Sequence, residues 1–465
     1  MTLVDMRLKE ASVYGYCLGY VAQGGTYNFM SAYFVLFLTN CVGMESSIAG
    51  TIASIALFAE VIAGIIVGNI SDNCKLRMGR RRPFILAAAI CMPIILLMIS
   101  QTIKTHSWIY YLFFAVAFRI VFSTFEIPNN ALGAEIATGY DERTALRTRS
   151  RAFSIIGNAI GYVLPLLVLS CFADNQQRGW QVIGIILASV TLISWFGSYV
   201  ITGISGADKN VNLHKNNSTK DKGNILRNYY ELVKLKPMRL LIIYKSAFSC
   251  AFALFNVSTI YYLSYCQNLK NDVSAYIWIY NIVIFVAMTP IVNKMALKYG
   301  KTNQQIITMS AAAITGILVF VFAPNNFVAS VLYIGVFAAM QTSFWQLSSS
   351  IFYDLIEVDE YKNGKRREGD IMSFVSVLGT LVTAVMVQIF GKMLSSVGFN
   401  PLLEQQSESV INFLNIFYIL IPSICFVIGV IALIFFPINK VVFNKLKEAI
   451  ELKNSGLDYD EHILD

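Results

Sequence analysis

Long apolar blocks separated by short charged loops are the feature that most constrains this 465-residue sequence. A helix needs about 20 apolar residues to cross the roughly 30 Å of hydrocarbon in a bilayer, and most of the blocks reach that length. Only 14% of the residues are charged, whereas soluble proteins carry about 25%. The sequence therefore predicts an all-α polytopic membrane protein with twelve spans. The predicted spans are 11–42, 46–74, 84–103, 107–137, 143–173, 181–204, 239–266, 272–297, 303–323, 327–357, 370–397 and 409–437.

The charge of the loops alternates along the chain. The cation-rich loops are 75–82, 143–151, 209–236, 294–301 and 362–367. The intervening loops carry little more than Lys104, Arg178 and Lys270. Since cytoplasmic loops carry the excess of Lys and Arg, we expect both termini in the cytoplasm and the chain in the cell (plasma or inner) membrane. The net charge of +8 therefore reflects topology, and no nucleic-acid partner is expected.

The longest polar segment divides the predicted spans into two sets of six. The expected parts are an N-terminal half 1–204, a cytoplasmic linker 205–238, a C-terminal half 239–437 and a cytoplasmic tail 438–465. The charged loops 75–80 and 294–301 resemble each other and follow the second span of each half. Two repeated six-helix halves are typical of a transporter that works by alternating access, with its substrate site at the membrane midplane.

Five ionisable residues lie deep enough in the predicted spans to need an explanation: Glu60, Arg119, Glu126, Arg151 and Lys245. A charge at the bilayer centre costs about 3 kcal/mol or more, so its default interpretation is functional. Arg119 and Glu126 are seven residues apart, so they share one helix face about 10 Å from each other. Glu60 either serves function or forms a structural ion pair with Arg119. Arg119 either neutralises one of the two acids or binds an anionic group of a substrate.

Three further sets of residues have competing interpretations. Arg151 lies ten residues, or about 15 Å, beyond a helix start near Asp141, so it either reaches the cavity or anchors the cytoplasmic interface. Lys245 lies two turns into its span, and we expect it to snorkel to the interface rather than contact a ligand. Tyrosines near the external end of the same span predict an interfacial aromatic belt; they are Tyr261, Tyr262 and Tyr265.

Several motifs together resemble the glycoside–pentoside–hexuronide:cation symporters, the melibiose-permease-like branch of the major facilitator superfamily. The motifs are Gly79-Arg-Arg-Arg-Pro-Phe, Glu126-Ile-Pro128, Asp141-Glu-Arg143, Phe344-Trp345, Asp359-Glu-Tyr-Lys and Arg366-Arg-Glu-Gly369. The resemblance covers nearly the whole chain and implies the major facilitator fold. It also implies that the movement of a cation drives the import of a sugar.

The resemblance carries site residues onto this sequence. It implies cation coupling at Glu60 and Ser123. The implied substrate-binding residues, with Arg119 added on the strength of its depth, are Arg119, Glu126, Asn130, Arg151, Asn256 and Trp345. Five features depart from the family pattern. Gly64 replaces a second acid, Ala63 replaces an amide and Asn130 replaces an aromatic residue. Residues 17–26 lack an acid, and Thr380 or a neighbour replaces a lysine.

These departures bear on the coupling ion. A hard cation such as sodium needs about six oxygen ligands, and one carboxylate with one hydroxyl is a poor cage. A lone buried glutamate can instead carry a proton, because burial penalises the charged form. The sequence therefore favours H+ as the coupling ion, with Na+ as the alternative, and predicts no other cofactor and no metal site.

Charges at the cytoplasmic helix ends predict a gate of ion pairs that break and form as the transporter switches. The proposed gate residues are Asp72, Arg77, Arg80, Asp359 and Arg366. In the tail, Phe443, Leu446 and Ile450 recur at helical spacing and indicate a short amphipathic helix at the membrane surface.

Two functions fit these features. The first is cation-coupled symport of a sugar, glycoside or hexuronide. The second is transport or export of a non-sugar substrate, such as a lysolipid, a peptide or an amphiphilic anion. An enzyme is not expected, since all three histidines lie outside the spans and the sequence shows no nucleophile–base constellation. The sequence also lacks a phosphate-binding loop motif, which disfavours ATP-driven transport. The expected partners are a small-molecule substrate and membrane lipids, and the protein is expected to act as a monomer.

Overall fold

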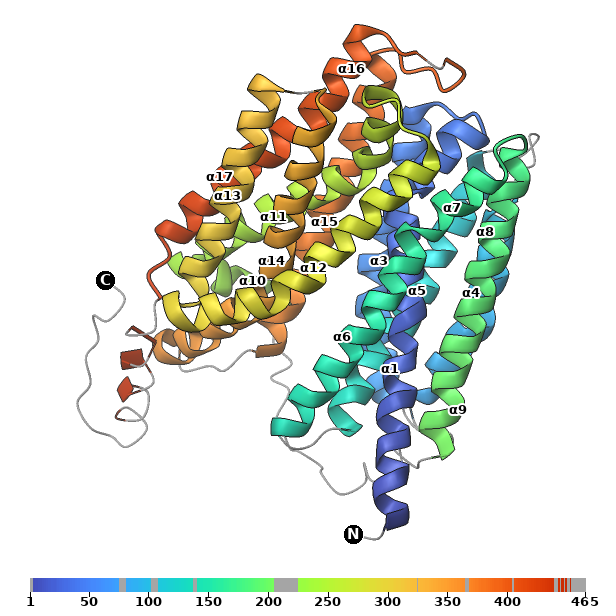
Figure 1. Cartoon of the computed structure of the whole chain (residues 1–465). Helices are drawn as coiled ribbons and strands as arrows, with labels where there is room; N and C mark the ends of the chain where they lie inside the picture. Colours follow the sequence, from blue (N-terminus) through green and yellow to red (C-terminus); the bar gives the residue numbers. More distant parts are fainter. Residues whose placement is uncertain are drawn as a thin grey trace. The chain divides into compact units, whose positions relative to one another are not determined.

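The protein is described by a computed structural model covering residues 3–74, 81–101, 108–136, 140–204, 225–323, 325–363, 368–403, 405–438 and parts of 442–452. Throughout these residues the regular structure is helical (Figure 1). The first elements are α1 (Leu3–Ala32), α2 (Phe34–Leu36), η1 (Phe37–Cys41), α3 (Ser46–Asn73), α4 (Arg82–Ile99), α5 (Trp108–Ile136), α6 (Tyr140–Tyr162), α7 (Leu164–Cys171), α8 (Gln176–Thr191), η2 (Leu192–Phe196) and α9 (Gly197–Ile204). The later elements are α10 (Ile225–Lys234), α11 (Lys236–Tyr261), η4 (Tyr262–Cys266), α12 (Asn271–Tyr299), α13 (Lys301–Phe322), α14 (Phe327–Asn363), α15 (Glu368–Ser396), α16 (Glu408–Asn415), η5 (Ile416–Leu420) and α17 (Ile421–Ile434).

Eleven helical stretches among the described residues are long and apolar enough to cross a membrane. They match the last eleven predicted spans to within several residues. The first predicted span, 11–42, falls on the nearly continuous helical run from α1 to η1. This run is more polar than the others, with buried Thr26 and Asn28, so it does not stand out by hydropathy. The helix pattern expected from the apolar blocks is confirmed.

The chain forms two compact units. The first comprises Met1–Ser218, Asn256–Ile279 and Ala384–Phe413, and the second comprises Thr219–Phe255, Tyr280–Thr383 and Leu414–Asp465. Within the first unit, α1 packs on α6 and α3 packs on α5. Within the second, α13 packs between α14 and α17. The division into halves at 205–238 stays a prediction, with α10 falling inside the predicted linker.

Glycines set the close approach of α1 and α6. A Cβ atom on Gly157 would collide with the carbonyl oxygen of Val21, and one on Gly161 would collide with that of Gly25. The two α6 glycines are four residues apart, which is the small-residue spacing that lets membrane helices meet at backbone distance. Dispersion contacts and not hydrophobic burial hold such a pair together, because lipid is as apolar as the helix surface.

The predicted tyrosine belt is wrong for two of its three residues. Tyr261 and Tyr262 are fully buried. The Tyr261 hydroxyl lies 2.7 Å from the hydroxyl of Thr39, and its ring packs against Phe390 and Phe399. A buried tyrosine needs a partner for its hydroxyl, and Thr39 supplies it. These rings are therefore core packing in the first unit.

We predict that Gly157→Ala destabilises the protein, because the added methyl group meets the Val21 backbone, which cannot rotate away. Overpacking of this kind typically costs about 1–3 kcal/mol. Thermal unfolding of the purified protein would measure the loss. The matched control is Gly68→Ala, whose methyl group would find its nearest neighbour, Ile127, at 3.9 Å. Equal melting temperatures for the two variants would contradict the prediction.

Candidate functional site

A stripe of polar side chains runs along one face of α5. Its members are Arg119, Ser123, Glu126 and Asn130, at spacings of four, three and four residues. Residues at these spacings lie above one another on one side of an α-helix. All four were predicted as site residues, and their common face follows from the spacing.

A matching stripe runs along α1, and the sequence reasoning missed it. Its members are Tyr16, Tyr20, Gln23 and Tyr27, again at spacings of four, three and four. None of them carries a charge, so none stands out in an apolar span as Arg119 and Glu126 do. The signal that could have found them is the helical spacing of hydrogen-bonding side chains within an apolar span.

The two stripes pair in antiparallel order and form what we call the polar ladder. The Arg119 guanidinium lies 5.6 Å from the centre of the Tyr27 ring. The Gln23 amide donates to the Glu126 carboxylate at 3.1 Å. The Tyr20 hydroxyl donates to the side-chain oxygen of Asn130 at 2.6 Å.

Glu60 of α3 joins the ladder through an ion pair. The distance from Arg119 Nη1 to Glu60 Oε2 is 2.7 Å, and the two side chains are 5% and 13% exposed. Of the two interpretations of Glu60 left open by the sequence, the structure contains the ion pair. Glu60 is therefore not the lone carboxylate that the argument for proton coupling assumed.

Ser123 does not share a ligand cage with the Glu60 carboxylate. Its hydroxyl donates to the backbone carbonyl of Glu60 at 3.4 Å. Among the described residues, no group of three or more acids, histidines or cysteines is arranged to hold a metal ion. Whether Glu60 and Ser123 act in cation coupling stays a prediction.

Glu126 differs from Glu60 in the nature of its partner. Its carboxylate accepts a hydrogen bond from the neutral amide of Gln23. Two buried polar atoms beside this acid lack hydrogen-bond partners, namely the side-chain oxygen of Gln23 and Nε of Arg119. Unused donor and acceptor capacity of this kind could serve a ligand rich in hydroxyl groups.

The remaining predicted residues of the first unit lie elsewhere. Asn256 of α11 is 3% exposed, and its side-chain oxygen accepts from the Tyr162 hydroxyl at 2.7 Å. Arg151 is exposed and lies near the start of the apolar stretch Arg149–Cys171. That position favours the interpretation of Arg151 as an interfacial anchor.

The second unit holds Trp345 and Lys245. Trp345 is 41% exposed and meets Phe248 and Phe252 edge to face. The Lys245 ammonium lies 5.0 Å from the centre of the Phe344 ring. Lys245 lies nine residues after the start of α11 at Lys236, and whether it snorkels to the interface stays a prediction.

Most of the predicted gate falls outside the described residues. These are Arg77, Arg80, Arg366 and the side chain of Asp72. Asp359 is fully buried in α14. The gate stays a prediction.

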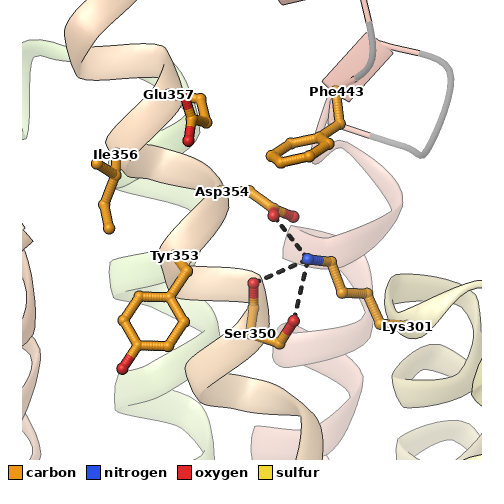
Figure 2. A pocket seen from close by; sticks show the side chains of 7 residues that line it. All are labelled: Lys301, Ser350, Tyr353, Asp354, Ile356, Glu357 and Phe443. Atoms are coloured by element: carbon orange, nitrogen blue, oxygen red, sulfur yellow. Dashed lines mark hydrogen bonds and ion pairs between the residues drawn. The ribbon is translucent and has the colours of Figure 1, made fainter. Parts of the chain in front are cut away.

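A different ion pair is described at the charged end of α13 and α14 in the second unit (Figure 2). Lys301 bonds Asp354 at 2.6 Å and the carbonyl oxygen of Ser350 at 2.8 Å. The pair borders a cavity of about 420 Å³ lined by Lys301, Ser350, Tyr353, Asp354, Ile356, Glu357 and Phe443. The tail packs here, since Phe443 lies over Lys301 and Leu446 is fully buried; Ile450 lies outside the described residues.

Comparison with known proteins identifies the family. Residues 15–440 match the family described as MFS/sugar transport protein. An uncharacterized symporter of Synechocystis sp. is 30% identical over 183 residues, 37% of this chain and 33% of that relative. The isoprimeverose transporter of Lactiplantibacillus pentosus is 21% identical over 92% of this chain and 88% of its own length.

A solved structure supports the fold. The crystal structure of a D-xylose-proton symporter superposes with a TM-score of 0.65 at 16% identity, covering 92% of this chain and 96% of the other. The predicted major facilitator fold is confirmed. The chain is a multi-pass membrane transporter of a small molecule and not an enzyme, and it belongs to the MFS/sugar transport family that includes the glycoside–pentoside–hexuronide:cation symporters.

Proposed function

We propose that this protein is a proton-coupled symporter of a sugar, glycoside or hexuronide, working by alternating access in the cell membrane with both termini in the cytoplasm. The observation that carries the proposal is the unequal pairing of the two acids at the polar ladder. Glu60 bonds a cation, Arg119, whereas Glu126 bonds a neutral amide. This difference assigns the proton to Glu126 in place of Glu60.

In this proposal Glu126 binds both the proton and a hydroxyl group of the sugar, and each binding event affects the other. Burial in apolar surroundings costs the charged form of a carboxyl more than the neutral form. A carboxylate only accepts hydrogen bonds, whereas a protonated carboxyl both donates and accepts them. A sugar hydroxyl can therefore be bound differently by the two forms of Glu126, which links proton binding to sugar binding.

The pairing of Glu60 also supports a proton over sodium. A sodium site needs several oxygen ligands converging on one point. The Glu60 carboxylate is committed to Arg119, and the Ser123 hydroxyl is directed to a backbone carbonyl. Freeing both groups for sodium would leave Arg119 buried without its partner, which is costly.

A sugar is favoured as the substrate by the chemistry of the ladder. Tyrosine hydroxyls and side-chain amides, present as Tyr20, Gln23 and Asn130, are neutral donors and acceptors suited to sugar hydroxyls. Proteins that carry sugars are among the relatives, namely the isoprimeverose transporter and the D-xylose-proton symporter. A lysolipid or peptide substrate would have less use for this row of neutral polar groups.

We predict that Glu126→Gln abolishes proton-driven accumulation while facilitated exchange of substrate continues. With one proton per sugar, a gradient of one pH unit is worth about 1.4 kcal/mol and supports about tenfold accumulation. The variant should reach only equal concentrations on both sides. Uptake of radiolabelled sugar by proteoliposomes, with an imposed pH gradient and then by counterflow without one, separates the two behaviours.

The control for this experiment is a sodium gradient at uniform pH, which should drive no accumulation in the wild-type protein. Strict dependence on sodium would contradict proton coupling. Tenfold accumulation by Glu126→Gln would remove Glu126 as the proton carrier. Failure of every sugar and glycoside, with transport of a lysolipid or peptide, would contradict the sugar assignment.

We predict that Glu60→Gln destabilises the protein by about 3–5 kcal/mol, because it leaves the Arg119 cation buried and unpaired. The double variant Glu60→Gln with Arg119→Gln should recover most of that loss, since both charges are removed together. Thermal and denaturant unfolding of the single and double variants form a cycle that measures the coupling. Additive losses in the double variant would show that the ion pair is not energetically important.

A further inference from the structure

Lys245 of α11 is an intramembrane cation with aromatic neighbours. Its ammonium lies 5.0 Å from the centre of the Phe344 ring and 5.7 Å from that of Trp345. Within the ranges that the structure describes, no carboxylate pairs with it. In this respect Lys245 differs from Arg119 and Lys301, which have Glu60 and Asp354 as partners.

The depth of Lys245 makes the lack of a carboxylate costly. Lys245 lies nine residues after the start of α11 at Lys236, or about 13 Å along the helix. A charge near the bilayer centre costs about 3 kcal/mol or more, and each desolvated cation–π contact recovers about 2 kcal/mol or more. The two rings can offset the cost of the charge but offer the ammonium no hydrogen-bond acceptor, and the default explanation of a lysine within a span is a functional role.

The Ser249 hydroxyl and Gly379 of α15 both lie beside the Lys245 side chain. A Cβ atom on Gly379 of α15 would lie 2.9 Å from Lys245 Cε, 3.3 Å from Ser249 Oγ and 3.4 Å from Lys245 Nζ. The ammonium and the Ser249 hydroxyl therefore lie close together beside the backbone of α15. The absence of a side chain at Gly379 leaves room for the lysine stem beside α15.

We propose that Lys245 and Ser249 form a subsite for a singly charged oxyanion group, a carboxylate or a sulfonate, on the transported sugar. This inference rests on the proposed function and narrows its substrate class to anionic sugars. The ammonium supplies a charge-assisted hydrogen bond and the serine a neutral one. Trp345 is 41% exposed beside them and offers apolar surface to the sugar ring.

The subsite selects against neutral sugars as well as for anionic ones. A neutral glycoside would cover the ammonium without replacing its lost water, so the cation would stay unpaired. Hydrogen bonds to charged groups are stronger than neutral ones. We expect a uronide to bind about ten- to a hundredfold more tightly than the matched neutral glycoside.

The test compares ligands that differ only at one position of the sugar. Purified full-length protein would be titrated with methyl glucoside, methyl glucuronide and a methyl glucoside carrying a sulfonate at C6. Dissociation constants would come from ligand-dependent thermal stabilisation. The key variant is Lys245→Met, which keeps the length of the stem and removes the charge. The matched control is Lys298→Met, because Lys298 is an exposed lysine 5.0 Å from the ring of Tyr299.

We expect Lys245→Met to lose the preference for anionic ligands while its weak binding of methyl glucoside is unchanged. Without ligand its melting temperature should be unchanged or higher, because an uncompensated charge has been removed. Lys245→Arg, which keeps the charge, should keep a preference for anions, and Lys298→Met should behave as wild type. Whether the uronide or the sulfonate binds better identifies the oxyanion.

Other outcomes would overturn the inference. If Lys245→Met melts lower and weakens all three ligands equally, Lys245 is structural. If methanesulfonate alone competes as well as the sulfonated sugar, the anion site is unrelated to sugar. Equal binding of neutral and anionic sugars by the wild type defeats the subsite but leaves proton-coupled sugar transport intact. Failure of all sugars to bind defeats the proposed function as well.

Discussion

The structure depends on one constraint, which is that a polar group inside a bilayer has no water to bond. The chain meets this constraint by pairing polar side chains across helices. The polar ladder between α1 and α5 does so with a tyrosine–asparagine bond and a glutamine–glutamate bond. The Glu60–Arg119 pair does so with opposite charges. These pairings fix the register of α1, α3 and α5 in the first unit, and the atoms they leave unbonded are where a ligand can act.

Half of this ladder could be predicted from the sequence and half could not. Arg119 and Glu126 can be recognised from the sequence, because charged residues in an apolar span are rare. Their spacing then places them on one face of the helix. Tyr20 and Gln23 carry no charge, and tyrosine is common in membrane helices as simple packing, so their role depends on which helix lies opposite. That information is the antiparallel register of α1 on α5, which no local pattern contains. The ion pair of Glu60 with Arg119 was one of two alternatives at the level of sequence. The sequence could not decide between them, because the two residues are 59 positions apart and meet only when α3 packs on α5.

The fold itself was more predictable than the side-chain environments within it. Apolar length decides where a helix crosses a bilayer, so the span pattern follows from composition alone. Burial of a particular side chain depends on packing between helices, and this is where the sequence interpretation failed. Tyr261 and Tyr262 were placed at the interface because tyrosine prefers it, but Thr39, Phe390 and Phe399 surround Tyr261. The aromatic surroundings of Lys245 were likewise not foreseen, since they depend on Phe344 of α14 and on the close approach of Gly379 of α15.

The proposed proton on Glu126 and the proposed anion at Lys245 are linked through the charges that they compensate. At the polar ladder, Glu60, Arg119 and ionised Glu126 sum to one negative charge in the first unit, and Lys245 adds one positive charge in the second. A proton on Glu126 neutralises the ladder, and an anionic sugar neutralises Lys245. These particular charges would be compensated within each unit only when both the proton and the anion are bound. Since a buried unpaired charge is costly near the bilayer centre, the loaded transporter would then rearrange at a lower cost than a half-loaded one. This difference would make the proton and the sugar move together.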